Sequence, residues 1–242
     1  LVRKQNYQEK VVMALIESVY ESAEALNTAF ADDIARLLSD AIASRGKASL
    51  MVSGGRTPLP LFQALCNADI DWSNVDVSLV DERWVDEQDD ASNTKLVKQN
   101  LMVGKAAAAR FVDMKSAESD AADAVLDCEA RLATMSQPFD VLILGMGEDG
   151  HTASLFPCSE QLEAGLDMNS GRVCIATQPT TAPHQRMSLT LPAIVSSRNI
   201  FLHLTGDKKR DVLNDALANA SAAEKPIVAV VNAAQVTLKW AP

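Results

Sequence analysis

The sequence of 242 residues has few of the side chains from which metal centres and disulfide frameworks are built. It contains three histidines and four cysteines, with no C-x-x-C pair. The cysteines, which are far apart from one another and from the histidines, are Cys66, Cys128, Cys158 and Cys174. This spacing predicts the reduced thiols of a cytoplasmic protein, and no metal site.

The sequence also lacks an uncharged apolar run near the ~20 residues that a membrane-spanning helix requires. Residues 1–8 carry charges and no apolar block with a small-residue cleavage site, so no secretory signal is expected there. Basic residues are outnumbered, since 22 Lys and Arg face 32 Asp and Glu and leave a net charge of −10. We therefore expect neither nucleic acid nor a membrane as a partner, although a local basic cluster can still bind a small anion.

What the sequence does contain is apolar material for a packed core, 48% of its residues. Short apolar runs typical of buried parallel strands alternate with helical patterns. Strands are predicted at 48–53, 75–80, 139–144, 172–177, 199–205 and 226–231, and helices at 22–44, 58–66, 92–102, 116–135 and 207–220. The alternation predicts an α/β fold, a three-layer αβα sandwich with a mostly parallel central sheet. No Pro/Gly-rich linker interrupts the chain, so one catalytic domain over residues 1–242 is expected.

Polar or glycine-rich segments follow several predicted strands, at 53–58, 81–84, 145–151 and 205–209. Ligands of open α/β sheets bind beyond the carboxyl ends of the strands, so we expect these segments to form one site. The first contains Ser53, Gly54, Gly55, Arg56 and Thr57 and opens a predicted helix. Its glycines let the backbone approach an anion, and the free N–H groups at the helix start face that anion. The spacing is not that of a P-loop. We interpret this segment as a phosphate-binding loop.

Residues 145–150 match the G-x-G-x-x-G pattern of dinucleotide-binding turns. The match is poor in context, because Glu148 and Asp149 would place negative charge against a pyrophosphate. Pro157 also prevents a long helix from starting there. We interpret the segment instead as a tight turn that presents Asp149 and His151.

His151 is predicted to be a general base. Histidine titrates near pH ~6.5 when unperturbed, which suits proton transfer from water near neutrality, and Asp149 can orient the ring. No serine lies in a G-x-S-x-G elbow, so water is the predicted nucleophile. Arg83, Arg186 and Lys209 are candidate anion ligands. A cation in the first turn of a helix, as predicted for Lys209, opposes the helix dipole and indicates a bound anion.

Five motifs in order make residues 22–240 resemble the glucosamine-6-phosphate isomerase/6-phosphogluconolactonase family. They are S-G-G-R-T-P at 53–58, D-E-R-W-V at 81–85, L-G-M-G-E-D-G-H-T-A-S-L-F-P at 144–157, R-M-S-L-T-L-P at 186–192, and T-G-D-K-K at 205–209. Ser92-Asn93 and Asn100-Leu101 also follow as in the family. Arg56 stands where many members have serine.

The resemblance implies the sugar-phosphate isomerase/deaminase-like fold. It also implies hydrolysis of 6-phospho-D-glucono-1,5-lactone to 6-phospho-D-gluconate in the oxidative pentose phosphate pathway, with neither a metal nor an organic cofactor. By the same resemblance the catalytic residues are His151 and Asp149. The substrate and its phosphate are then expected on Ser53, Gly54, Gly55, Arg56, Thr57, Asp81, Arg83, Arg186 and Lys209.

Other functions fit parts of the sequence. Sugar-phosphate deaminases of the same fold resemble it at Asp81 and in the D-G-H turn, but they carry a glutamate where this chain has Phe156. A non-catalytic sugar-phosphate sensor would be expected to carry a DNA-binding module, and a nicotinamide oxidoreductase is what the glycine pattern alone favours. A monomer or weak homodimer is expected. The choice between 1,5- and 1,4-lactones and the donors to the oxyanion stay open.

Overall fold

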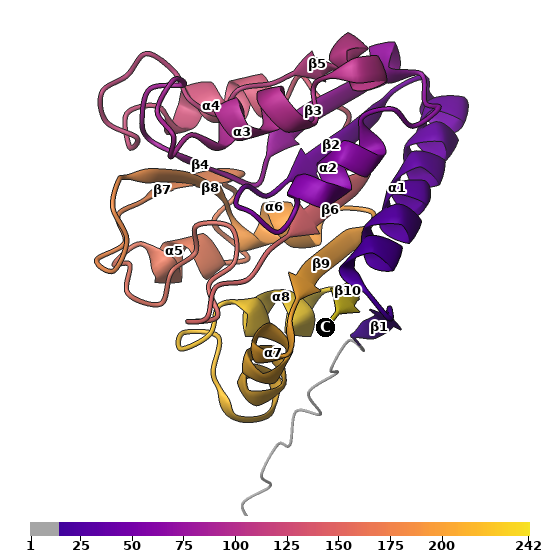
Figure 1. Cartoon of the computed structure of the whole chain (residues 1–242). Coiled ribbons are helices and arrows are strands. Elements are labelled where there is room, and N and C mark those ends of the chain that lie inside the picture. Colours follow the sequence, from indigo (N-terminus) through magenta and orange to yellow (C-terminus); the bar gives the residue numbers. More distant parts are fainter. Residues whose placement is uncertain (1–14) are drawn as a thin grey trace, which may run out of the picture.

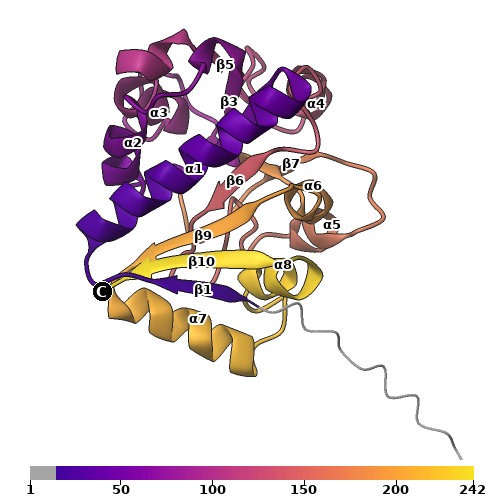
Figure 2. The same cartoon turned by 90° about the vertical axis from the view of Figure 1, so that its right-hand side faces the viewer.

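A computed structural model describes residues 15–242. Its centre is a parallel seven-stranded sheet in the order β1-β10-β9-β6-β2-β3-β5, flanked by helices (Figures 1 and 2). Helix α1 packs along β2 and β10, and α7 packs against β9. This arrangement confirms the predicted αβα sandwich. A smaller antiparallel sheet, in the order β4-β8-β7, lies beside it.

The central strands are β1 (Ile16–Val19), β2 (Ala48–Val52), β3 (Val75–Leu79), β5 (Arg110–Phe111), β6 (Val141–Leu144), β9 (Ile200–Thr205) and β10 (Val236–Ala241). The small sheet consists of β4 (Asp81–Arg83), β7 (Cys174–Thr177) and β8 (Arg186–Leu189). The α-helices are α1 (Ala23–Arg45), α2 (Leu59–Leu65), α3 (Asn93–Asn100), α4 (Val125–Leu132), α5 (Leu162–Leu166), α6 (Leu191–Val195), α7 (Asp207–Asn219) and α8 (Ile227–Ala233).

Local sequence signals explain the longest helix. The Ser22 side chain accepts a hydrogen bond from the Ala25 N–H at the start of α1, and Gly46 ends the helix in the left-handed conformation, with φ of 79°. The apolar stripe that faces the sheet includes Phe30 and Ile34, both fully buried. All residues of β2, β3 and β6 are buried, as expected for strands covered on both faces.

Two predicted elements are wrong. Residues 226–231, predicted as a strand, begin helix α8, because Pro226 suits a helix start and a short buried apolar run fits either element. Of the helix predicted at 116–135, only α4 (Val125–Leu132) is α-helical. The segment before α4 is held by contacts to side chains distant in sequence, since Trp84 Nε1 donates to the Glu118 carbonyl and the Gln185 side chain accepts from the Ala121 N–H. The predicted strand at 172–177 exists as β7, but it belongs to the small sheet.

The single domain predicted over 1–242 includes residues 1–14, which lie outside the described residues. The prediction that residues 1–8 hold no secretory signal falls in the same part of the chain. No helix within 15–242 combines the length and apolar character that a membrane span needs. The same residues contain no group of three or more His, Cys, Asp or Glu placed to hold a metal ion.

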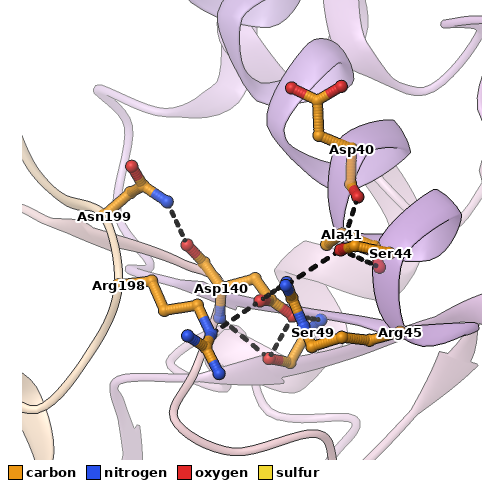
Figure 3. Close-up of polar contacts among 8 residues, drawn as sticks. All are labelled: Asp40, Ala41, Ser44, Arg45, Ser49, Asp140, Arg198 and Asn199. Atoms are coloured by element: carbon orange, nitrogen blue, oxygen red, sulfur yellow. Dashed lines mark hydrogen bonds and ion pairs between the residues drawn. The ribbon is translucent and has the colours of Figure 1, made fainter.

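A buried carboxylate ties the amino ends of the strands together (Figure 3). Asp140 precedes β6 and is 1% exposed. Its carboxylate contacts Arg45 Nη2 at 2.5 Å and Arg198 Nε at 3.3 Å, and it accepts the Ser49 N–H at 3.0 Å. The Asn199 amide donates to the Asp140 carbonyl at 2.8 Å. These contacts join α1, β2, β6 and the start of β9 at the amino ends of the strands, opposite the site described next.

Candidate active site

A cavity of about 280 Å³ lies at the carboxyl ends of β2, β6 and β9, next to the small sheet. The structure brings most of the predicted site residues to this cavity. Those that line it are Ser53, Gly54, Gly55, Arg56, Thr57, Asp81, Arg83, His151, Arg186 and Lys209. Asp149 does not line the cavity, but its carboxylate contacts Nδ1 of the His151 ring. Thr205 of the predicted segment 205–209 also lines the cavity, as do Asn93, Phe156 and His203, which were not among the predicted site residues.

The turn after β6 positions the histidine. The Gly147 N–H donates to the His151 carbonyl at 2.9 Å, and the Thr152 hydroxyl donates to the Gly145 carbonyl at 2.8 Å. A Cβ atom at Gly147 would lie 2.2 Å from His151 Nδ1. The glycine pattern therefore serves to fold a tight turn under the imidazole, as we interpreted it from the sequence.

Asp149 sets the proton position on the ring. Its Oδ1 lies 2.5 Å from His151 Nδ1 and also accepts the His151 backbone N–H at 3.1 Å. Burial alone would raise the pKa of Asp149, but the hydrogen bonds and charge of His151 outweigh it and lower that pKa below its usual value. Because the carboxylate is ionised and accepts the Nδ1 proton, the neutral imidazole keeps its lone pair on Nε2.

Phe156 fixes the plane of the imidazole. The two rings stack with centroids 4.0 Å apart and an angle of 24° between their planes. Phe156 is 5% exposed, and the Arg186 guanidinium carbon lies 5.8 Å from the centroid of the same phenyl ring. The histidine is thus held at Nδ1 by a carboxylate and on one face by a phenyl ring, which leaves little freedom for the ring to turn.

Ser154 joins the histidine turn to the small sheet. Its hydroxyl donates to Asp81 Oδ2 at 2.6 Å, and its N–H donates to the Ser188 hydroxyl at 3.0 Å. Its carbonyl accepts the Thr177 hydroxyl at 3.0 Å. The strands that contribute these partners, β4, β8 and β7, are those of the small sheet. The hydrogen bonds of the Ser154 hydroxyl, N–H and carbonyl therefore set the position of His151 relative to the small sheet.

The small sheet places two guanidinium groups side by side. Arg83 and Arg186 are directly opposite each other in the antiparallel β4–β8 pair, so their side chains lie on one face. Arg83 Nη1 donates to the Ala91 carbonyl and Arg186 Nη2 to the Pro183 carbonyl, while both Nε atoms are buried with no partner among residues 15–242. Burial lowers the pKa of Arg186, the attraction of Asp81 and Glu82 opposes this fall, and the charge of Arg83 adds to it.

Lys209 supplies a third positive charge, from the first turn of α7, and its ammonium donates to the Met146 carbonyl. Within the described chain, no carboxylate forms an ion pair with Arg83, Arg186 or Lys209. Three positive charges line one cavity with no carboxylate at ion-pair distance, and Asp81, Glu148 and Asp149 attract them only from farther away, so the cavity favours an anionic ligand.

The glycine loop faces the same cavity. In the described part of the chain, the N–H groups of residues 54–57 donate to no backbone acceptor, and Gly55 has a positive φ of 88° that favours glycine. The Ser53 hydroxyl, expected to contact the ligand, donates to the Ile143 carbonyl at 2.8 Å and accepts the Gly145 N–H at 3.0 Å. These two hydrogen bonds of Ser53 hold the loop against the end of β6. The side chain of Arg56 is exposed.

Comparisons with known proteins find similar sequences and a similar fold. Residues 21–240 match the family model described as glucosamine-6-phosphate isomerases/6-phosphogluconolactonase. A 6-phosphogluconolactonase of Rhizobium meliloti is 42% identical over 226 residues, which cover 93% of this chain and 97% of that protein. One of Pseudomonas putida is 42% identical and covers 93% of each chain. The crystal structure of a 6-phosphogluconolactonase from Shewanella baltica, 42% identical, superposes with a TM-score of 0.92 and covers 96% of this chain and 99% of its own.

Proposed function

This chain belongs to the glucosamine-6-phosphate isomerase/6-phosphogluconolactonase family, and we propose that it hydrolyses 6-phospho-D-glucono-1,5-lactone with His151 as the base. It is a lactone hydrolase of the pentose phosphate pathway, like its relatives of up to 42% identity. The observation that carries the mechanism is one cavity lined by an imidazole, which a carboxylate holds, and by three cations that form no ion pair within the described residues.

In the proposed mechanism, His151 Nε2 takes a proton from water as the water oxygen attacks the lactone carbonyl carbon. The resulting oxyanion is stabilised by a backbone N–H group or by Arg83, and the ionised Asp149 stabilises the imidazolium. The imidazolium then returns the proton to the ring oxygen as the carbon–oxygen bond breaks, which yields 6-phosphogluconate. The reaction as proposed needs no metal, because basic side chains supply the positive charge.

We assign the phosphate to Arg186, Lys209 and the N–H groups of the glycine loop. Asp81 is a carboxylate and repels phosphate, so it suits a hydroxyl of the sugar better. The deaminase alternative requires a proton-exchanging group at position 156, where a phenyl ring instead stacks on the histidine. A cytoplasmic location and a monomer or weak homodimer stay predictions from the sequence.

Replacing Arg186 by methionine is expected to raise KM for the phosphorylated lactone about 10- to 100-fold, because a hydrogen bond to a charged group contributes about 1.5–3 kcal/mol. The value of kcat/KM for unphosphorylated gluconolactone is expected to change much less. Initial rates on freshly generated lactones, corrected for spontaneous opening, measure both. An equal loss on the two substrates would remove Arg186 from the phosphate site, and absence of turnover by the wild type would overturn the proposed function.

As pH rises, the affinity for a phosphate ester is expected to fall, and to do so at a lower pH than it would with a lysine of ordinary pKa at position 209. Burial lowers the pKa of Lys209, and the attraction of Glu148 and Asp149 offsets it only in part. The ammonium is therefore lost sooner as pH rises, and with it a charge-assisted hydrogen bond. Calorimetric titration with 6-phosphogluconate from about pH 7 to about pH 10 measures this. In the Lys209→Arg variant the charge persists and the alkaline loss should disappear; identical pH profiles would refute the assignment.

A further inference from the structure

Asn93 is the first residue of α3 and is placed by a buried carboxylate. Glu82, 1% exposed, accepts the backbone N–H groups of Asn93 at 2.8 Å and Thr94 at 2.7 Å, and the Ser92 hydroxyl at 3.2 Å. Burial raises the pKa of Glu82, and these N–H groups oppose the rise. The carboxylate thus caps α3 and holds Asn93, itself 1% exposed, at the wall of the cavity.

The side-chain amide of Asn93 lies between β4 and the glycine loop. Its Nδ2 donates to the Asp81 carbonyl at 2.9 Å, while its Oδ1 is buried and has no hydrogen-bond donor within the described residues. A Cβ atom at Gly54 would lie 1.9 Å from Asn93 Oδ1 and 2.8 Å from Nδ2. The amide therefore rests against the Gly54 backbone, in the space that any other residue at position 54 would need.

This contact requires glycine at position 54. Its φ lies outside the left-handed region, unlike that of Gly55, and the three atoms nearest to an added Cβ all belong to Asn93. The methyl group of an alanine at position 54 would therefore collide first with the Asn93 amide. The side chain that position 54 can carry thus depends on the side chain at position 93.

From these contacts we infer that Asn93 is a positioning residue, which holds the glycine loop at a fixed distance from β4 and so sets the phosphate site. The inference rests on the proposed function, in which the N–H groups of this loop bind the substrate phosphate. In this proposal Asn93 acts through Gly54 and Gly55 and takes no part in the proton transfer. Its loss should therefore weaken binding of the phosphate and leave the chemical step nearly intact.

The Asn93→Ala variant is expected to bind 6-phosphogluconate and inorganic phosphate about tenfold more weakly, with KM for the phosphorylated lactone raised by a similar factor. The value of kcat is expected to stay within a factor of about three, and kcat/KM for unphosphorylated gluconolactone should change little. Asn100→Ala is the matched control, since Asn100 lies on the same helix and also donates to a backbone carbonyl, that of Leu96 at 2.8 Å. It does not line the cavity and should leave phosphate binding unchanged.

A double variant separates positioning from loss of stability. Gly54→Ala alone should weaken phosphate binding because the new methyl group collides with the Asn93 amide. Adding Asn93→Ala removes the collision, so the double variant should bind phosphate no more weakly than Gly54→Ala alone, whereas independent effects would multiply. A merely structural asparagine would lower the unfolding midpoint without this coupling.

The outcomes distinguish this inference from the proposed function. If the wild type opens the lactone and Asn93→Ala binds inorganic phosphate as tightly as the wild type, the inference is overturned and the function stands. If the wild type fails to open the lactone, the function falls, while the calorimetric comparison of phosphate binding still tests the positioning of the loop. Fully additive losses in the double variant would also overturn the inference.

Discussion

Replacing His151 by asparagine is expected to lower kcat by a factor of about 10²–10⁴, the contribution usual for a positioned general base. Asparagine keeps a polar side chain in the turn but cannot take a proton from water at neutral pH. Because the phosphate ligands stay in place, KM should change little. A stopped assay with freshly generated 6-phosphogluconolactone, corrected for spontaneous hydrolysis, measures the effect.

The same substitution at His184 is the control for the His151 prediction. His184 is exposed, lies outside the cavity and has a positive φ of 71°, which asparagine adopts readily. Its asparagine variant should keep wild-type kcat. A folded His151→Asn enzyme that turns over at a near-normal rate would remove the imidazole from the mechanism and leave hydrolysis to some other base.

Replacing Asp140 by alanine is expected to reduce the free energy of unfolding by about 3 kcal/mol, the lower end of the range for breaking a buried ion pair. The lower end applies because its partners Arg45 and Arg198 have side chains 36% and 42% exposed, so water can solvate them after the change. The Ser49 N–H, in contrast, would be left buried without its carboxylate acceptor. Urea denaturation with an unchanged m-value measures the loss.

Asp40→Ala is the matched control for the Asp140 prediction. Asp40 also pairs with an arginine of α1, Arg36 at 3.4 Å, but both side chains are more than half exposed. Its removal should cost no more than about 0.5 kcal/mol. The Asp140 variant should keep the wild-type KM, because its network joins the amino ends of the strands and the cavity lies at their carboxyl ends. Equal stability of the two variants would show that the buried network contributes nothing beyond a surface pair.

Local patterns predicted the elements whose boundaries depend on neighbours in sequence. The helix expected at 22–44 begins after the Ser22 cap and ends one residue late at Arg45, before a left-handed glycine. The strands predicted at 48–53 and 75–80 match β2 and β3 within one residue. The pattern failed at 226–231, where five apolar residues in a row have no periodicity that separates a helix from a strand.

The short strands of the small sheet were harder to predict for a different reason. Strand β4 has three residues, all of them charged, and β8 has four, of which Arg186 is charged and Ser188 is polar. Their pairing depends on backbone hydrogen bonds between segments about a hundred residues apart in sequence, as Arg83 and Arg186 are. No local pattern in either segment indicates that partner, so the sheet that carries two of the cations was not predicted.

From the sequence alone it was possible to predict which segments line the cavity: the glycine loop, the acidic segment that follows β3 and the turn that contains His151, each after a buried apolar run. This was possible because glycine, proline and charged residues act on the backbone within a few positions. Three contacts could be learned only from the folded chain: Phe156 stacks on His151, Arg83 lies opposite Arg186, and the Asn93 amide fills the space beside Gly54. These contacts depend on how closely separate elements pack in three dimensions, and neither the spacing nor the identity of residues along the chain specifies that packing.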